Sequence, residues 1–216
     1  MTTSLLPQPR GLRYDPGLAC HHLSQADPKL GQLIARVGPC TLRPRATQSL
    51  FAALTRSIVY QQLSGSAAAT ILGRVIDLFP DTRFPRPEDI LACPPERLRA
   101  AGLSTAKTAA VRDLAARTLD GTVPPLAVVH RMTDEEIIER LTLVRGIGRW
   151  TVEMLLIFRL GRPDVLPVDD LGVRKGFGRT FTKRALPAAR TLTRWAERWR
   201  PYRSVGSWYM WRALEL

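Results

Sequence analysis

The residues best suited to chemistry lie between positions 143 and 175, in the segment LVRGIGRWTVEMLLIFRLGRPDVLPVDDLGVRK. Two glycines, Gly146 and Gly148, precede an apolar stretch with helical periodicity, and a glycine hairpin at a helix N-terminus can bind a phosphate through backbone N–H groups. Further along, the adjacent carboxylates Asp169 and Asp170 stand where a second helix should begin. A helix N-terminus stabilises a carboxylate's negative charge, which can in turn stabilise a developing cation. The pattern indicates an enzyme that acts on a nucleotide within DNA.

Both features also have a plainer interpretation. A Gly-x-Gly sequence often forms an ordinary turn between helices, and an aspartate before a helix is an ordinary N-cap. The basic residues Arg145 and Arg149 and the hydroxyl of Thr151 surround the hairpin and favour the phosphate site. Two adjacent aspartates are more than a cap needs.

The charge of the chain supports a polyanionic partner. Its 216 residues include 32 Lys and Arg against 19 Asp and Glu, a formal net charge of +13. After Asp170 there are only two acidic residues, Glu197 and Glu215, and these basic residues: Arg174, Lys175, Arg179, Lys183, Arg184, Arg190, Arg194, Arg198, Arg200, Arg203 and Arg212. DNA is the expected partner. The alternative is a genome whose base composition enriches arginine throughout.

Other classes of protein are not supported by the sequence. The three cysteines, Cys20, Cys40 and Cys93, are scattered, so neither a disulfide framework nor a zinc or iron–sulfur site is expected. The histidines lack the spacing of a metal site. No run of about 18 apolar residues or N-terminal signal pattern is present, so we expect a cytoplasmic protein without a membrane span.

The elements that must position these residues are predicted to be helices. Apolar residues recur at spacings of three and four, and alternation typical of strands is nearly absent. Start signals occur at Asp27-Pro28, at Pro94-Pro95, at Ser104 and at the capping box Thr133–Glu136. The last two helices lie near the C-terminus, the final one after Pro201. The predicted fold is all-α.

Several segments besides the hairpin resemble the helix-hairpin-helix (HhH-GPD) DNA glycosylase superfamily, and within it the 3-methyladenine DNA glycosylase II (AlkA-like) family. They are DPKLGQLIARVGPCTLRPR (27–45), SIVYQQLSGSAAATI (57–71), LRAAGLSTAKTAAVRDLA (98–115) and ERWRPYRSVGSWYMWRALE (197–215). The resemblance implies two helical lobes with an active-site cleft between them, in a compact form without the N-terminal β-domain of longer members.

The expected organisation follows from that resemblance. After a flexible tail at residues 1–12, residues 13–50 and 163–216 would form one discontinuous helical lobe. Residues 51–162 would form a central helical bundle that ends in the helix-hairpin-helix motif.

The resemblance also assigns the chemistry. Asp170, in the sequence Asp170-Leu171-Gly172-Val173, matches the superfamily's catalytic aspartate. Bifunctional members place a lysine nucleophile directly before the hairpin threonine, where this chain has Trp150. The resemblance therefore implies a monofunctional enzyme without lyase activity.

Further residues are assigned to the base pocket and to DNA. Leu63 matches an apolar side chain that fills the gap left by a flipped base, although a core leucine is the plainer interpretation. The other residues assigned to DNA binding are Gln62, Gly146, Gly148, Arg149 and Thr151. The base pocket is expected to comprise Trp150, Trp211, Met154, Leu171 and Tyr60. Met154 and Leu171 stand where well-known relatives have tyrosines, which indicates a more open pocket.

The expected function is therefore excision of alkylated bases, 3-methyladenine and 7-methylguanine, from double-stranded DNA in base excision repair, by a monomer. Indole faces suit such bases because alkylation makes a purine cationic. No organic cofactor is implied, and a monovalent cation (Na⁺ or K⁺) would bind the carbonyls of Thr142, Val144 and Ile147. Two alternatives remain: a glycosylase for other damaged or mismatched bases, and a non-catalytic hairpin protein that only binds DNA.

Overall fold

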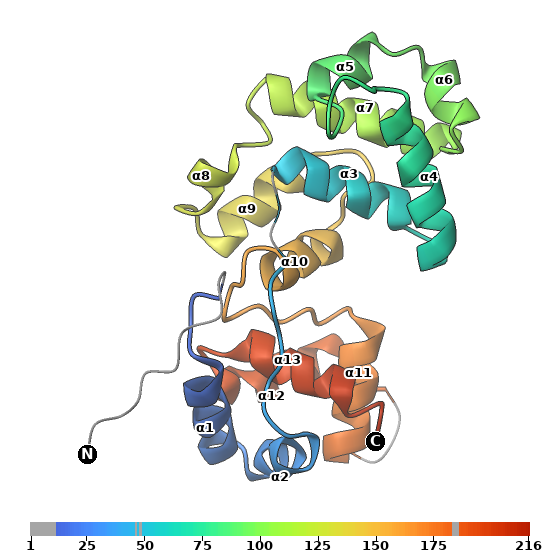
Figure 1. Ribbon diagram of the computed structural model, residues 1–216. Coiled ribbons are helices and arrows are strands. Elements are labelled where there is room, and N and C mark those ends of the chain that lie inside the picture. Colours follow the sequence, from blue (N-terminus) through green and yellow to red (C-terminus); the bar gives the residue numbers. More distant parts are fainter. Residues whose placement is uncertain (1–11, 46, 48, 183–185) are drawn as a thin grey trace. The chain divides into compact units, whose positions relative to one another are not determined.

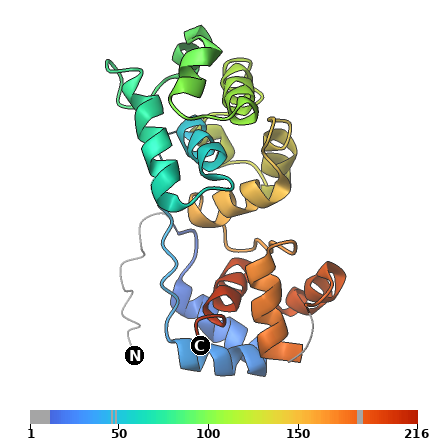
Figure 2. The ribbon, with the colours of Figure 1, turned by 90° about the vertical axis from the view of Figure 1, so that its right-hand side faces the viewer.

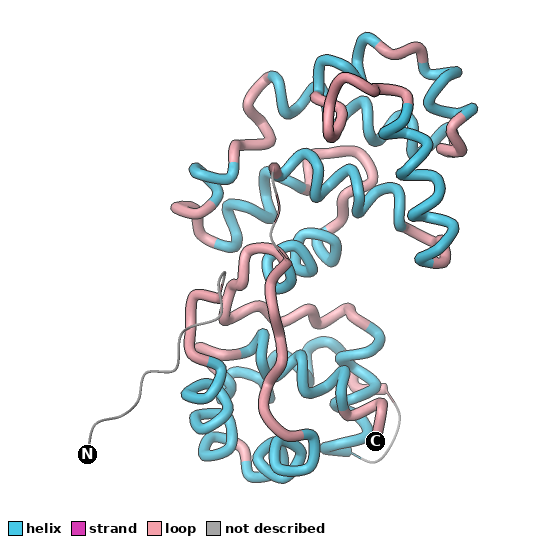
Figure 3. The backbone as a smooth tube through the Cα atoms, in the orientation of Figure 1, coloured by secondary structure: helices cyan, strands magenta, loops and turns pink. Residues whose placement is uncertain are grey.

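The computed structural model describes residues 12–45, 47, 49–182 and 186–216, and every regular element within them is helical (Figure 1; Figure 3). This confirms the predicted all-α class. The tail expected at residues 1–12 lies, except for residue 12, outside the described residues, as do the basic residues Lys183 and Arg184.

The chain divides into two compact units. Unit 1 comprises the described residues of 1–46 and 153–216, and unit 2 those of 47–152. The boundaries predicted from the sequence lie after residue 50 and before residue 163. In the structure, the second boundary between the units falls earlier in the sequence. It lies within one helix, α10 (Arg149–Phe158), which begins in unit 2 and continues into unit 1.

Unit 2 carries the helices that lead up to the hairpin. They are α3 (Leu50–Tyr60), α4 (Gly65–Asp77), α5 (Pro87–Ala92), α6 (Pro95–Ala100), α7 (Thr105–Leu119), α8 (Leu126–Val129) and α9 (Asp134–Leu141). The predicted caps are confirmed. The Ser104 hydroxyl accepts the Lys107 N–H at 3.2 Å, and Thr133 and Glu136 form the reciprocal capping box. Because α7 packs against both α3 and α5, it is the central helix of this unit.

Unit 1 is built from helices at both ends of the chain. They are α1 (Pro16–Ala26), α2 (Pro28–Val37), α11 (Leu171–Phe177), a π-helical turn η1 (Gly178–Thr182), α12 (Ala189–Ala196), a 3₁₀ turn η2 (Glu197–Trp199) and α13 (Arg203–Arg212). The predicted helix after Asp27 is α2. The helix α1 was not predicted from the sequence. Its start is marked by Asp15, whose side chain accepts the N–H groups of Gly17 and Leu18.

The core of unit 1 is rich in aromatic side chains. The buried carboxylate of Asp27 accepts the indole N–H groups of Trp195 at 2.8 Å and Trp199 at 3.2 Å. The rings of Phe177 and Phe181 stack at 4.7 Å between centroids and contact both indoles. These bonds join α2 to α12 and η2, and thus the N-terminal part of unit 1 to its C-terminal part.

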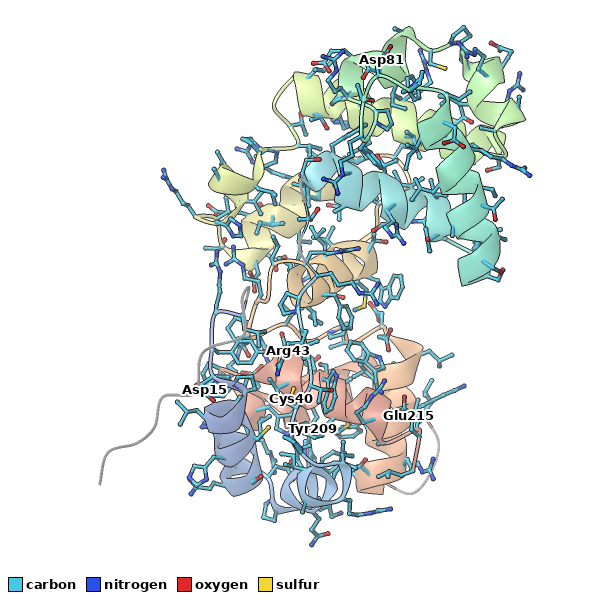
Figure 4. All side chains as sticks on the ribbon, in the orientation of Figure 1. Asp15, Cys40, Arg43, Asp81, Tyr209 and Glu215 are labelled. Atoms are coloured by element: carbon cyan, nitrogen blue, oxygen red, sulfur yellow. The ribbon has the colours of Figure 1, made fainter. Side chains whose placement is uncertain are left out.

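A second link between the two ends of the chain is the hydroxyl of Tyr209 on α13. It donates to the carbonyl of Gly38 at 2.9 Å and lies 3.1 Å from Cys20 Sγ, and Figure 4 labels it beside Cys40. Burial raises the pKa of the Cys40 thiol to about 11, so this thiol stays protonated. Among the described residues, no group of His, Cys, Asp and Glu could hold a metal ion, and no helix there is long and apolar enough to cross a membrane.

In unit 1 there is a close approach of α11 to α13, which lie side by side in Figure 2. It occurs at Gly176, where an added Cβ would overlap the backbone carbonyl of Met210. Backbone cannot move aside as a flexible side chain can. A glycine is therefore required at this position, although its backbone conformation is not unusual.

Gly176→Ala is expected to lower the free energy of unfolding by about 3 kcal/mol or more, because overpacking against backbone costs at least the upper end of the usual range. Gly73→Ala, within α4, is the matched control, since an added Cβ there meets nothing within 4 Å. It should stabilise by roughly 0.5–1 kcal/mol through lower backbone entropy of the unfolded chain. Urea denaturation of both variants measures the two effects; similar stabilities would contradict the packing argument.

Candidate active site

Asp170 is held at the N-terminus of α11 by two hydrogen bonds to one oxygen. Its Oδ1 accepts the backbone N–H of Val173 at 2.8 Å, which is the bond of an N-cap, and the indole N–H of Trp211 at 2.8 Å. Asp169 is exposed just before it. The N-cap interpretation is therefore correct for Asp170, but a cap alone does not explain the second donor. Carboxylate and indole form one fixed group.

The indole of Trp211 is positioned on two further sides. Its ring lies 5.4 Å from that of Phe158, at 32° between the planes. On another side it approaches the backbone of Gly172 so closely that an added Cβ would lie 2.7 Å from Trp211 Cδ1. Neither Phe158 nor Gly172 was predicted from the sequence to be a site residue. The sequence could have indicated this contact through Gly172 in the Asp-Leu-Gly-Val motif, because a glycine inside a short helix often marks a place where another group approaches the backbone closely.

Two other residues assigned to the base pocket also lie in unit 1. Leu171 is the first residue of α11 and is 53 % exposed, a large apolar side chain in solvent beside the catalytic candidate. Met154, on α10, is partly exposed. Unit 1 thus brings Asp170, Leu171 and Trp211 together, with Phe158 as an additional aromatic wall.

The hairpin lies in unit 2, between α9 and α10. Gly146 has φ +77°, a conformation that favours glycine, and the N–H of Arg145 beside it donates to the Asp113 carboxylate at 2.7 Å. Gly148 has no positive φ, but nothing lies within 4 Å of the position that a Cβ would take there. A glycine here therefore leaves the backbone open to a large group, as a phosphate-binding hairpin requires.

The residues that follow the hairpin differ in their exposure. Trp150 is 47 % exposed, although most of the apolar stretch that follows it on α10 is buried. Thr151 is buried, and its assignment to DNA binding stays a prediction. Arg149 forms a two-pronged ion pair with Glu135, at 2.8 and 3.0 Å, and its guanidinium lowers the pKa of that carboxyl.

The turn between α3 and α4 places Leu63 at the surface. Leu63 is 40 % exposed, so the core interpretation of this leucine is wrong. Gln62 before it has φ +56°, the one positive value of a non-glycine residue in the described part of the chain. Tyr60, at the end of α3, has the Arg56 guanidinium 4.5 Å from its ring centroid and bonded to its hydroxyl at 2.8 Å. Arg56 therefore covers one face of this proposed pocket ring.

The residues expected to hold a monovalent cation form the loop that enters the hairpin. Thr142 is the C-cap of α9, and the carbonyl of Val144 accepts the N–H of Ile147 at 3.0 Å, which closes the turn. Backbone carbonyls are hard, uncharged oxygen donors of the type that bind K⁺ or Na⁺. The donor set therefore fits such an ion.

Comparison with known proteins shows the family to which this chain is related. Residues 55–201 match the family described as HhH-GPD superfamily base excision DNA repair protein. The chain is 36% identical over 198 residues to DNA-3-methyladenine glycosylase 1 of Schizosaccharomyces pombe, covering 90% of this chain and 86% of that protein.

Solved structures give the same result. The structure of S. pombe 3-methyladenine DNA glycosylase (Mag1) in complex with abasic DNA superposes with a TM-score of 0.79 at 36% identity, covering 92% of this chain and 97% of that one. The DNA-3-methyladenine glycosidase of Bacillus halodurans gives a TM-score of 0.82 at 32% identity, covering 90% and 88%. The chain therefore belongs to the HhH-GPD superfamily of base excision DNA repair proteins.

Proposed function

We propose that this protein is a monofunctional DNA glycosylase that removes alkylated purines, 3-methyladenine and 7-methylguanine, from double-stranded DNA. The observation that carries the proposal is the carboxylate of Asp170, fixed by the N-terminus of α11 and by the indole of Trp211. Relatives named 3-methyladenine glycosylases, which cover most of the chain, support the same reaction. Pure DNA binding would need neither the carboxylate nor the aromatic wall beside it.

The chemistry starts from the charge of the lesion. Alkylation at N3 or N7 makes the purine cationic, so the bond between C1′ and N9 breaks with both electrons going to the base, which leaves as a neutral molecule. The sugar becomes an oxocarbenium-like cation, and the negative charge of Asp170 stabilises it. Water then adds to C1′ and releases a proton, leaving an abasic site.

The nucleotide must leave the duplex before this reaction. Flipping costs a few kcal/mol, and less for a damaged base. We assign Leu63 and Gln62 to the gap in the stack, because the turn that carries them presents an apolar side chain to solvent. The hairpin amides of Gly146 and Gly148 would bind a phosphate nearby. We also propose a monomer, no organic cofactor, and a monovalent cation at Thr142, Val144 and Ile147 that holds the hairpin in place.

Methylated DNA incubated with the protein should release 3-methyladenine and 7-methylguanine and keep an intact strand with abasic sites, because Trp150 replaces the lysine of the lyases. Asp170→Asn should lower the single-turnover rate by about 100-fold or more, since it removes charge stabilisation of the transition state. Binding to lesion DNA should change little. Asp169→Asn is the matched control and should lower the single-turnover rate much less. An inactive Asp169→Asn with an active Asp170→Asn would reverse the assignment.

The hydrogen bond from Trp211 should itself support the rate. Trp211→Phe keeps an aromatic ring but cannot donate to Asp170 Oδ1, and losing a bond to a charged group should slow excision about tenfold. Trp208→Phe, on the same helix α13, makes the same change at an indole whose nitrogen bonds to no carboxylate in the described chain. Its rate should match that of the unmodified protein. Equal rates for the two variants would show that the Trp211 N–H has no part in excision.

The rate of excision should depend on the charge of the damaged base. Leu171 and Met154 offer little aromatic surface, so the indoles of Trp150 and Trp211 should contribute most of the attraction, worth about 0.5–2 kcal/mol for a cation over a ring. Excision of 7-methylguanine should therefore be much faster than that of neutral hypoxanthine. Trp150→Ala should slow release of 7-methylguanine while affinity for undamaged DNA stays within a few-fold. Single-turnover rates on both lesions test this, and equal rates in the unmodified protein would refute it.

A further inference from the structure

The turn that carries Leu63 is held by a lysine from another helix. Lys107, in the first turn of α7, donates from Nζ to the carbonyl of Val59 at 2.7 Å and to that of Gln61 at 2.7 Å. These carbonyls lie at the C-terminal end of α3, where the helix leaves its last carbonyls without intrahelical partners and carries partial negative charge. Burial lowers the pKa of the Lys107 ammonium, in keeping with a group that trades water for protein oxygens.

The conformation that Lys107 holds is unusual. Directly after the second carbonyl, Gln62 adopts φ +56°, in a region that non-glycine residues rarely occupy. Such a conformation persists only when its surroundings enforce it. Its effect here is to turn the chain so that Leu63 is exposed, with its N–H donating to the Tyr60 carbonyl at a long 3.4 Å.

The same turn is joined to the hairpin. Gln61 donates from Nε2 to the carbonyl of Gly146 at 2.9 Å. On the other side of the hairpin, the Asp113 carboxylate of α7 accepts the N–H of Arg145 at 2.7 Å. The helix α7 thus holds the Leu63 turn through its cation Lys107 and the hairpin through its anion Asp113, and Gln61 connects the two.

We propose that Lys107 is a positioning residue for the side chain that replaces the flipped nucleotide: it fixes the turn of residues 61–63 so that Leu63 enters the stack at a set distance from the phosphate-binding hairpin. This rests on the proposed function, which assigns Leu63 to the gap. Lys107 contacts neither DNA nor the reacting base in this scheme. It acts only through the turn.

The chain offers a matched control on the same helix. Arg112 donates from one nitrogen to the carbonyls of Ile90, Leu91 and Cys93, at 3.0, 3.2 and 2.8 Å, and so caps the end of α5 as Lys107 caps the end of α3. The end of α5 carries none of the residues assigned to DNA. A purely structural capping role would therefore give similar results for Lys107→Met and Arg112→Met.

The first test is a double-mutant cycle on single-turnover release of 7-methylguanine, with thermal unfolding as the measure of stability. Lys107→Met should slow excision by roughly ten- to hundredfold, as small misplacements of a binding element do. Lys107→Arg should restore most of the rate, and Arg112→Met should lower stability but not the rate. Lys107→Met combined with Leu63→Ala should be no slower than Leu63→Ala alone, because residues acting through one element are not additive. The proposal would be overturned if the fold-reductions of the two single variants multiplied in the double variant, or if Lys107→Met excised the base at the normal rate.

The second test does not depend on catalysis. A duplex with an abasic site and 2-aminopurine next to it reports on the stack, because unstacking of 2-aminopurine raises its fluorescence. The unmodified protein and Arg112→Met should raise the signal at saturation, whereas Leu63→Ala and Lys107→Met should not. A full signal with Lys107→Met overturns the positioning role. If the unmodified protein gives the signal but releases no methylated base, the proposed function fails while the role of Lys107 stands.

Discussion

The hydrogen bond from the Trp211 indole to Asp170 Oδ1 is the interaction on which the candidate site depends. It joins the N-terminus of α11 to the C-terminal end of α13, and it can form only because both helices approach each other over glycines. A Cβ at Gly172 would lie 2.7 Å from the indole, and a Cβ at Gly176 would overlap the backbone of Met210. Two glycines within one short helix thus set the distance between the carboxylate and the aromatic wall.

The hairpin and the Leu63 turn depend on a comparable arrangement in unit 2. There the shared support is α7, whose buried positions pack against α3 and α5 while Lys107 and Asp113 reach backbone groups of the two turns. Bonds from charged side chains to backbone are suited to this task, because they are stronger than neutral ones and leave the side chains of the turn available. Surface ion pairs such as that of Arg149 with Glu135 contribute much less.

The family of this protein and its proposed mechanism rest on different observations. Membership follows from the match of residues 55–201 and from the similarity to the S. pombe and B. halodurans proteins over most of the chain. The proposed chemistry follows from one carboxylate at a helix N-terminus next to an indole, together with a tryptophan in place of a lysine. The exposure of Leu171 on α11 supports our proposal that the range of lesions is governed by charge more than by close fit.

The sequence by itself determined the helical class and most helix starts, because these are local properties. The candidate catalytic residue, Asp170, was identified through the resemblance of its motif to that of the superfamily. Helices begin and end at prolines, glycines and capping residues such as Ser104 and Thr133, which act within a few residues of their own position. It did not reveal α1, whose apolar pattern is weak, or the burial of Thr151. Contacts between distant residues needed the tertiary structure: Trp211 with Asp170, Phe158 with Trp211, and Lys107 with the end of α3. No local pattern encodes such pairs, since their partners meet only when separate helices pack.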